Sequence, residues 1–86
     1  MSVARYFFNI YNGTQSRDDV GSECIDAAAV RAEAVETMEE LFGGKLSKGR
    51  DASSMSINVT DIDGKTVMIV TATASVETVK GSSLTL

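Results

Sequence analysis

Three groups of residues in this chain have the types and spacing that chemistry requires, and the first is Asp61 and Asp63 before Gly64. Alternating carboxylates followed by glycine are typical of the opening of a calcium-binding loop, in which oxygen ligands converge on a hard cation. An EF-hand loop that began at Asp61 would need a bidentate glutamate at position 72, where this chain has Ala72. The same segment lies between two runs of β-branched residues, and Asp-Gly in that setting indicates a β-hairpin turn. We therefore expect a turn here and no metal site.

The second candidate is Cys24, the only cysteine in the chain. A thiol becomes a nucleophile when a base converts it to the thiolate, and the chain has no histidine to serve as that base. Negative charge on the neighbouring Glu23 and Asp26 disfavours a further anion, which raises the pKa of the thiol. We expect a buried, unreactive side chain, with a redox-responsive or intermolecular thiol as the alternative. The residue counts also exclude a metal site built from histidine and cysteine.

The third candidate is the aromatic run Tyr6-Phe7-Phe8 beside Arg5, because aromatic side chains on a strand can stack on RNA bases. Such platforms lie in basic surroundings, whereas this chain has 8 basic and 12 acidic side chains and a net charge of −4. Negative charge opposes binding to phosphate backbones and to anionic lipid. We expect the rings to pack in a core or an oligomer, and we predict no nucleic acid and no membrane as partners.

A set of glutamates in the middle of the chain offers carboxylates for acid-base chemistry. A chain of 86 residues buries enough apolar surface for one thin core but not for a deep cleft, so we assign these carboxylates to a solvated helix face. They are Glu33, Glu36, Glu39 and Glu40. The sequence therefore predicts a protein that is not an enzyme, with no catalytic residue, no cofactor and no metal.

The compartment is predicted from the cysteine count and the N-terminal residues. One cysteine cannot form an internal disulfide, and small secreted domains usually carry an even set. The residues after Met1 lack the apolar stretch and cleavage site of a signal peptide, and the chain has no run of about 20 apolar residues that would span a membrane. We therefore expect a cytoplasmic protein.

The first elements that position these residues are two strands and a turn. Aromatic and β-branched residues predict a strand over 3–11, which stops at the turn dipeptide Asn12-Gly13. Residues 14–19 offer almost no apolar side chain, so we expect the return strand to be a short, exposed edge. In the first strand, the predicted core residues are Tyr6, Phe8 and Ile10.

A helix is predicted from Ala27 to Phe42, because apolar residues recur there at the spacing of one helical face. Asp26 is the expected N-cap, and Gly43-Gly44 is expected to end the helix in left-handed geometry. Residues 45–54 have no apolar period and are predicted to form a loop.

Two registers are open for the hairpin that follows. A two-residue turn pairs Val59 with Met68, whereas a turn with Gly64 in a left-handed bulge pairs Val59 with Val67. We prefer the second register because it separates apolar from polar side chains more cleanly. It places four residues on the core face: Ile57, Val59, Val67 and Ile69.

The predicted fold is α+β, an antiparallel sheet of two hairpins in the order β-β-α-β-β with one helix packed on one face. The domain covers residues 1–73, and residues 74–86 form a C-terminal extension that is a further strand or a dimerising tail. The chosen register leaves an apolar set on the face opposite the helix, and such patches usually mark an interface. Together with two residues of the extension, which can pair with a second copy across an open edge, the candidate interface is Phe7, Tyr11, Met68, Val70, Val76 and Val79.

The order of several short motifs resembles a family of small alphaproteobacterial proteins, abundant in rhizobia, whose function is unknown. The motifs cover about residues 4–71: Arg5-Tyr6-Phe7-Phe8-x-Ile10, Gly13, Asp18-Asp19-x-Gly21-x-Glu23, Asp26, Arg31-Ala32-Glu33-Ala34 and Val59-Thr60-Asp61-x-Asp63-Gly64. The resemblance implies a short strand-helix-strand domain and no assigned activity. This chain departs from the pattern at Asn9, where similar chains often have histidine, in the return strand after Gly13, which lacks the usual apolar residues, and in the extension beyond about Thr73. Cys24 stands where the pattern usually has an apolar residue.

Two functions are compatible with these observations. The first is a non-enzymatic interaction module that self-associates through the open sheet face or the C-terminal tail, with a homodimer or another protein as the partner. The alternative is a module that binds a peptide or a small ligand at the sheet edge or on the open face.

Overall fold

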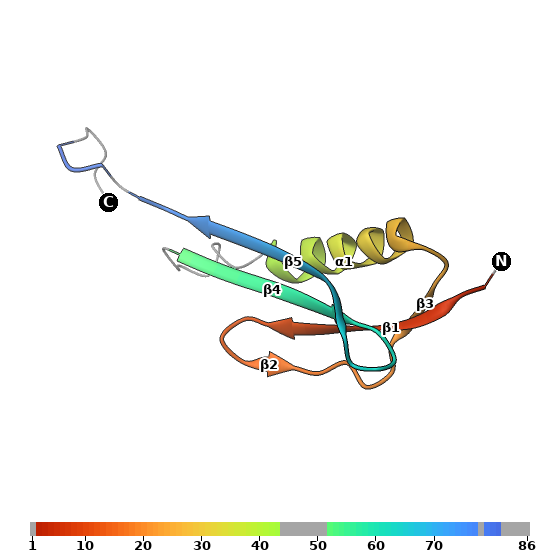
Figure 1. The fold of residues 1–86 in the computed structure, drawn as a ribbon. Coiled ribbons are helices and arrows are strands. Elements are labelled where there is room, and N and C mark those ends of the chain that lie inside the picture. Colours follow the sequence, from red (N-terminus) through yellow and green to blue (C-terminus); the bar gives the residue numbers. More distant parts are fainter. Residues whose placement is uncertain (1, 44–51, 78, 82–86) are drawn as a thin grey trace.

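The computed structural model describes residues 2–43, 52–77 and 79–81, and it shows an α+β domain (Figure 1). One helix packs on an antiparallel sheet, as predicted, and the sheet has five strands where two hairpins were expected. In chain order the elements are β1 (Ala4–Tyr11), β2 (Gln15–Ser16), β3 (Ser22–Cys24), α1 (Ala27–Phe42), β4 (Ala52–Thr60) and β5 (Thr66–Ser75).

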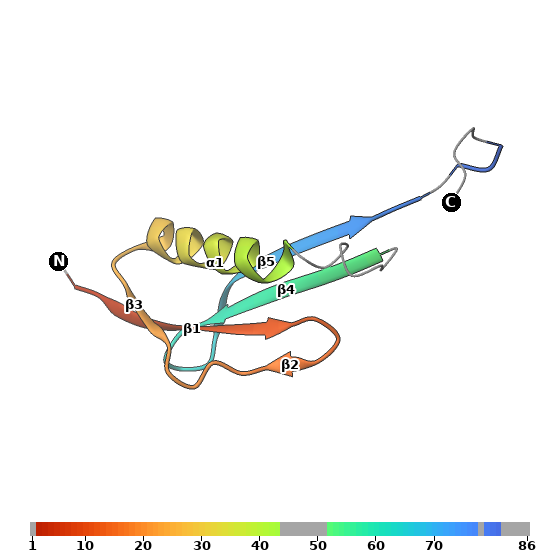
Figure 2. The same cartoon turned by 180° about the vertical axis from the view of Figure 1, so that it is seen from behind.

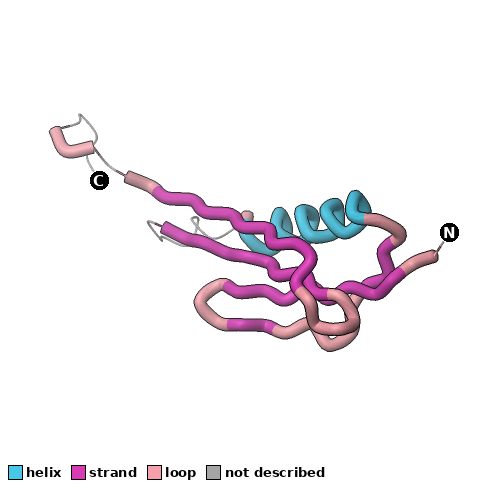
Figure 3. Tube along the Cα trace, viewed as in Figure 1, coloured by secondary structure: helices cyan, strands magenta, loops and turns pink. Residues whose placement is uncertain are grey.

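The sheet has the strand order β2-β1-β4-β5, with β3 pairing the first half of β1 (Figure 3). Every pairing is antiparallel. Strand β1 is central because it pairs with β2, β3 and β4, whereas β5 pairs with β4 alone among the described residues. Strand β2 is short and fully exposed, as predicted for the return strand after Gly13.

The core lies between α1 and one face of the sheet, and α1 covers β4 and β5 (Figure 2). Alternation along β1 turns Phe8 inward as a buried residue and packs Tyr6 and Ile10 against the core, which confirms the predicted core set. The buried residues of the core are Phe8, Cys24, Val30, Ala34, Met38, Met55, Ile57 and Val59.

Helix α1 has the predicted bounds, and its first turn is capped by Asp26. The Asp26 carboxylate accepts a hydrogen bond of 2.8 Å from the amide of Ala29, which satisfies one of the free donors at the start of a helix. The predicted left-handed ending is wrong at Gly43, whose φ of −58° and ψ of −24° are right-handed. Gly44 and the predicted loop up to residue 51 lie outside the described residues.

The turn between β4 and β5 is the predicted one. The amide of Gly64 donates to the carbonyl of Asp61 at 3.0 Å, and Gly64 has a φ of +81°. The amide of Asp61 donates to the carbonyl of Lys65 at 2.9 Å, so the loop closes on a left-handed glycine bulge.

The predicted register beyond the turn is wrong, because a further bulge follows it. Thr60 lies opposite Thr66, but Val59 lies opposite Met68, so Val67 is an extra residue on β5. One extra residue exchanges the two faces of the strand for every position after it. Val67 and Ile69 are therefore 45% and 62% exposed instead of buried. Met68, Val70 and Ala72 take their places against the core.

One additional strand and two strand boundaries also differ from prediction. Strand β3 was not predicted, β4 begins at Ala52 within the predicted loop, and β5 continues past Thr73 to Ser75. Tyr11, the last residue of β1, lies opposite Ser56, so the first four residues of β4 have β5 as their strand neighbour. The β4–β5 ribbon therefore extends beyond the end of β1, and it also passes the end of α1 (Figure 1).

Gly21 and Gly13 provide a matched test of how tightly the loop before β3 packs on β1. Both have positive φ, but a Cβ at Gly21 would lie 2.8 Å from the carbonyl oxygen of Tyr6 and 2.9 Å from the Phe7 ring, whereas at Gly13 it would meet nothing within 4 Å. We expect Gly13→Ala to lower the free energy of unfolding by about 1 kcal/mol through backbone strain. Gly21→Ala should lower it by about 3 kcal/mol, because overpacking adds to the strain. Urea denaturation of both variants measures this difference, and equal losses would contradict the close packing.

Candidate functional site

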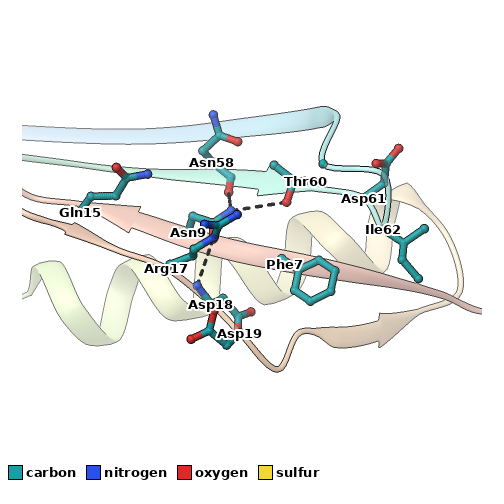
Figure 4. A pocket seen from close by; sticks show the side chains of 11 residues that line it. Phe7, Asn9, Gln15, Arg17, Asp18, Asp19, Asn58, Thr60, Asp61 and Ile62 are labelled. Atoms are coloured by element: carbon teal, nitrogen blue, oxygen red, sulfur yellow. Dashed lines mark hydrogen bonds between the residues drawn. The ribbon is translucent and has the colours of Figure 1, made fainter.

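A concavity lies on the open face, by which we mean the sheet face away from α1. This open-face hollow has a volume of about 790 Å³. Its floor comes from β1 and β4, and its walls come from the segment after β2 and the β4–β5 turn (Figure 4). The lining residues are Phe7, Asn9, Gln15, Arg17, Asp18, Asp19, Asn58, Thr60, Asp61, Ile62 and Gly64.

Asn9 holds the floor of the hollow together. Its side-chain Nδ2 donates to the carbonyl of Asn58 at 3.2 Å and lies 3.5 Å from Oγ1 of Thr60, while its Oδ1 accepts from the amide of Asp18 at 3.0 Å (Figure 4). One amide group therefore links β1 to β4 and to the segment after β2. The side-chain donor and acceptor of Asn9 are thus used within the fold.

Asp18 fixes the loop that leads into β3. Its Oδ1 accepts from the amides of Val20 and Gly21 at 3.1 and 3.0 Å, and its Oδ2 accepts from the amide of Phe8 at 3.0 Å. Burial alone would raise the pKa of Asp18, but the three amide donors, with nearby Arg5, lower it below its usual value of 3.8. The carboxylate is thus a structural anchor between the loop and β1.

Asp61 has the same kind of role in the β4–β5 turn. Its Oδ1 accepts from the amides of Asp63 and Lys65 at 2.9 and 3.0 Å, so the carboxylate stabilises the turn that the sequence predicts. Within residues 2–43, 52–77 and 79–81, no three metal-ligating side chains gather at one point. Asn9, Asp18 and Asp61 thus use polar atoms of their side chains in hydrogen bonds within the fold. Three further polar residues form the exposed rim of the hollow: Gln15, Arg17 and Asp19.

Cys24 is the last residue of β3 and is 5% exposed, which confirms the predicted burial. Burial raises the pKa of the thiol, and Glu33, whose Oε2 lies 3.6 Å from Sγ, raises it further. Glu33 also accepts a hydrogen bond of 2.9 Å from Oγ of Ser22. Glu33 is therefore half-buried and links the helix to β3, so its assignment to a solvated face is wrong. The other three helix glutamates are exposed, as predicted.

The structure divides the predicted interface residues between the two faces of the sheet. Phe7 and Tyr11 lie on the open face, as predicted, with Phe7 half-buried and Tyr11 exposed. The placement of Met68 and Val70 beside them is wrong, because both pack against the core under α1. Ile69, which is 62% exposed, takes their place on β5, and the open face otherwise carries mainly polar residues on the two long strands: Ser54, Ser56, Asn58, Thr60, Thr71 and Thr73.

The two candidates from the tail, Val76 and Val79, are 55% and 68% exposed and follow β5 along the chain. Strand β5 itself was missed as a site. Its ten residues form an edge of the sheet, and they include no charged residue. The uncharged run was visible in the sequence, but the strand order that places it at an edge was not.

Comparison with known proteins identifies a family and no relative of known function. The sequence pattern of a family described as a domain of unknown function (DUF6894) matches residues 5–73. No curated protein and no solved structure gives a significant match to the chain. In the described part of the chain, no helix has both the length and the apolar character needed to cross a bilayer.

Asp18 and its exposed neighbour Asp19 allow a test of the structural role of the anchor. Asp18→Asn removes an acceptor from the amide of Phe8, Val20 or Gly21, so we expect it to lower the free energy of unfolding by about 2 kcal/mol at neutral pH. Asp19→Asn, the control, should change it by less than about 0.5 kcal/mol.

The effect of Asp18→Asn should also depend on pH in a defined direction. A carboxyl group whose pKa is lower in the folded state stabilises the protein above its unfolded pKa and loses that contribution as the pH falls through its folded pKa. The difference between wild type and Asp18→Asn should therefore shrink below pH ~4. Thermal unfolding across an acid pH series measures it, and a difference that stays constant would show that the charge of Asp18 is unimportant.

Proposed function

Since the chain belongs to the DUF6894 family, whose function is unknown, we propose from its own surface that it is a non-enzymatic interaction module that binds an extended polypeptide by strand addition to β5. In this mode, the backbone groups of an edge strand pair with those of the added strand. The side chains of alternate residues then contact the partner on the two faces of the sheet.

The observation that carries the proposal is the edge of β5, which has β4 as its one strand neighbour in the part of the chain that the structure describes. Native proteins usually blunt such edges with charged side chains, proline, bulges along the strand or very short strands. Strand β5 has ten residues, and the chain has neither proline nor a charged residue from Thr66 to Val76. Its bulge lies at the start of the strand, at Val67. The rest of the strand is regular and presents a continuous row of backbone groups.

The length of the β4–β5 ribbon gives further support. Ala52 to Met55 and their partners Ala72 to Ser75 form a pair of strands beyond the end of β1. Two-stranded ribbons are marginally stable in water, and a third strand on the β5 side would widen this part of the sheet. Strand addition therefore supplies a neighbour where the fold itself provides few.

The other surfaces of the described structure are weaker candidates for a binding site than the edge of β5. The apolar patch that motivated face-to-face association is reduced on the open face, because Met68 and Val70 point toward the helix and Ile69 is the one apolar residue that β5 presents there after its bulge. In the open-face hollow, Asn9, Asp18 and Asp61 are engaged in hydrogen bonds within the chain. Cys24 is buried with a raised pKa, which argues against thiol catalysis.

A soluble peptide of alternating valine and threonine, with one lysine and one glutamate at its ends, tests strand addition directly. We expect it to shift and protect backbone amides along β5 in NMR spectra of the full chain. Thr71→Lys should weaken peptide binding by about tenfold, because a charged side chain in the middle of the edge opposes pairing.

Ala32→Lys is the matched control, since it adds the same charge at an exposed position of α1. It should leave the peptide affinity unchanged. Amide shifts confined to the open-face hollow around Phe7 and Asn9 would contradict strand addition and favour a ligand site on that face. The absence of any shift along β5 would also contradict it.

A further inference from the structure

Resting on the proposed role of the β5 edge, we propose that its partner is a second copy of this chain. The two β5 strands pair antiparallel about a two-fold axis that passes midway between the two copies of Thr71, so that Thr71 of one copy lies opposite Thr71 of the other. In this register the residue numbers of each opposed pair add up to twice that of Thr71. Such an interface is isologous, so each contact away from the axis occurs twice.

The side chains of β5 on the core face are self-complementary in size. The strand carries its larger residues, Met68 and Val70, before Thr71 and its smaller residues, Ala72 and Ala74, after it. The proposed register places Val70 opposite Ala72 and Met68 opposite Ala74 of the second copy. Each pair therefore joins a large to a small side chain, as close packing across a pair of strands requires.

The charges that flank β5 are complementary in the same register. Lys65 comes directly before the strand and Glu77 follows it by two residues, and both are exposed. Antiparallel pairing about Thr71 brings the end of each β5 that carries Lys65, on the far side of the Val67 bulge, toward the end of the other β5 that carries Glu77. No charged residue lies between them, so nothing within the paired segment repels its counterpart.

The symmetry also preserves the two layers of the fold. An axis perpendicular to the sheet continues it from β4–β5 into the β5 and β4 of the second copy and leaves both helices on one side. Because α1 lies over β4 and β5, the core face of β5 stays covered from its own copy. The open faces of the two copies also become one continuous face, on which Ile69 lies opposite Thr73 of the second copy.

Light scattering of the full chain over a concentration series, up to the millimolar range, tests the second copy. We expect a concentration-dependent dimer in the wild type and in Ala32→Lys, and a monomer in Thr71→Lys. A wild-type chain that stays monomeric overturns the second copy as the partner, while strand addition itself is decided separately by the peptide experiment. A dimer that survives Thr71→Lys unchanged places the interface elsewhere and overturns the pairing.

Single cysteines in a Cys24→Ala background test the axis. Across the axis the Cα atoms of residue 71 lie about 4.5 to 5.5 Å apart, within the range of a disulfide, whereas those of residue 73 lie about 14 Å apart. Thr71→Cys should therefore give a covalent dimer on oxidation, and Thr73→Cys should not. The reverse result overturns the register.

Charge reversal tests the register independently of cysteine chemistry. Lys65→Glu and Glu77→Lys should each weaken the dimer, by roughly tenfold at low salt, because each creates two like-charge pairs. The double variant should restore wild-type affinity. Single reversals without effect, or a double variant weaker than either, overturn the antiparallel arrangement that brings the Lys65 end of one β5 to the Glu77 end of the other.

Discussion

The extra residue in β5 decides which side chains the sheet presents to the helix. Because Val67 bulges out opposite Val59, every later residue of β5 changes face relative to a regular hairpin. Met68, Val70 and Ala72 consequently complete the core beside Ile57 and Val59. The same shift moves Ile69, Thr71 and Thr73 to the open face, so a single bulge accounts both for the closed core and for a largely polar surface opposite it.

Carboxylate and amide side chains fix the segment that follows β1, where apolar residues are few. The segment from Thr14 to Asp19 has no apolar side chain to bury, and the two residues of β2 are exposed. Asp18 instead binds three backbone amides, and Asn9 links β1 with β4 and with the segment that holds Asp18. These hydrogen bonds place β3 beside β1, and β3 in turn supplies Cys24 to the core.

The parts that the sequence predicted are those in which local chemistry determines local structure. The helix bounds follow from a 3.6-residue period and the Asp26 cap, and the turn follows from Asp61 and Gly64. The register failed because a bulge depends on how two strands twist and pack, which the pattern of one strand does not contain. Glu33 was assigned to water because its contacts, Ser22 and Cys24, lie on a strand that was not predicted. The edge position of β5 likewise depends on strand order.

The pairing of β1 with β4 has a cost in chain entropy that the hairpin does not have. The hydrogen bond from Asn9 to Asn58 joins residues 49 positions apart, whereas the bond from Lys65 to Asp61 spans 4. Loop closure scales with the logarithm of length, so the longer closure costs about 2 kcal/mol more. The central strand of the sheet is thus the one whose attachment is entropically most demanding, and its fixed contacts through Asn9 and Asp18 offset a loss that the local turn never incurs.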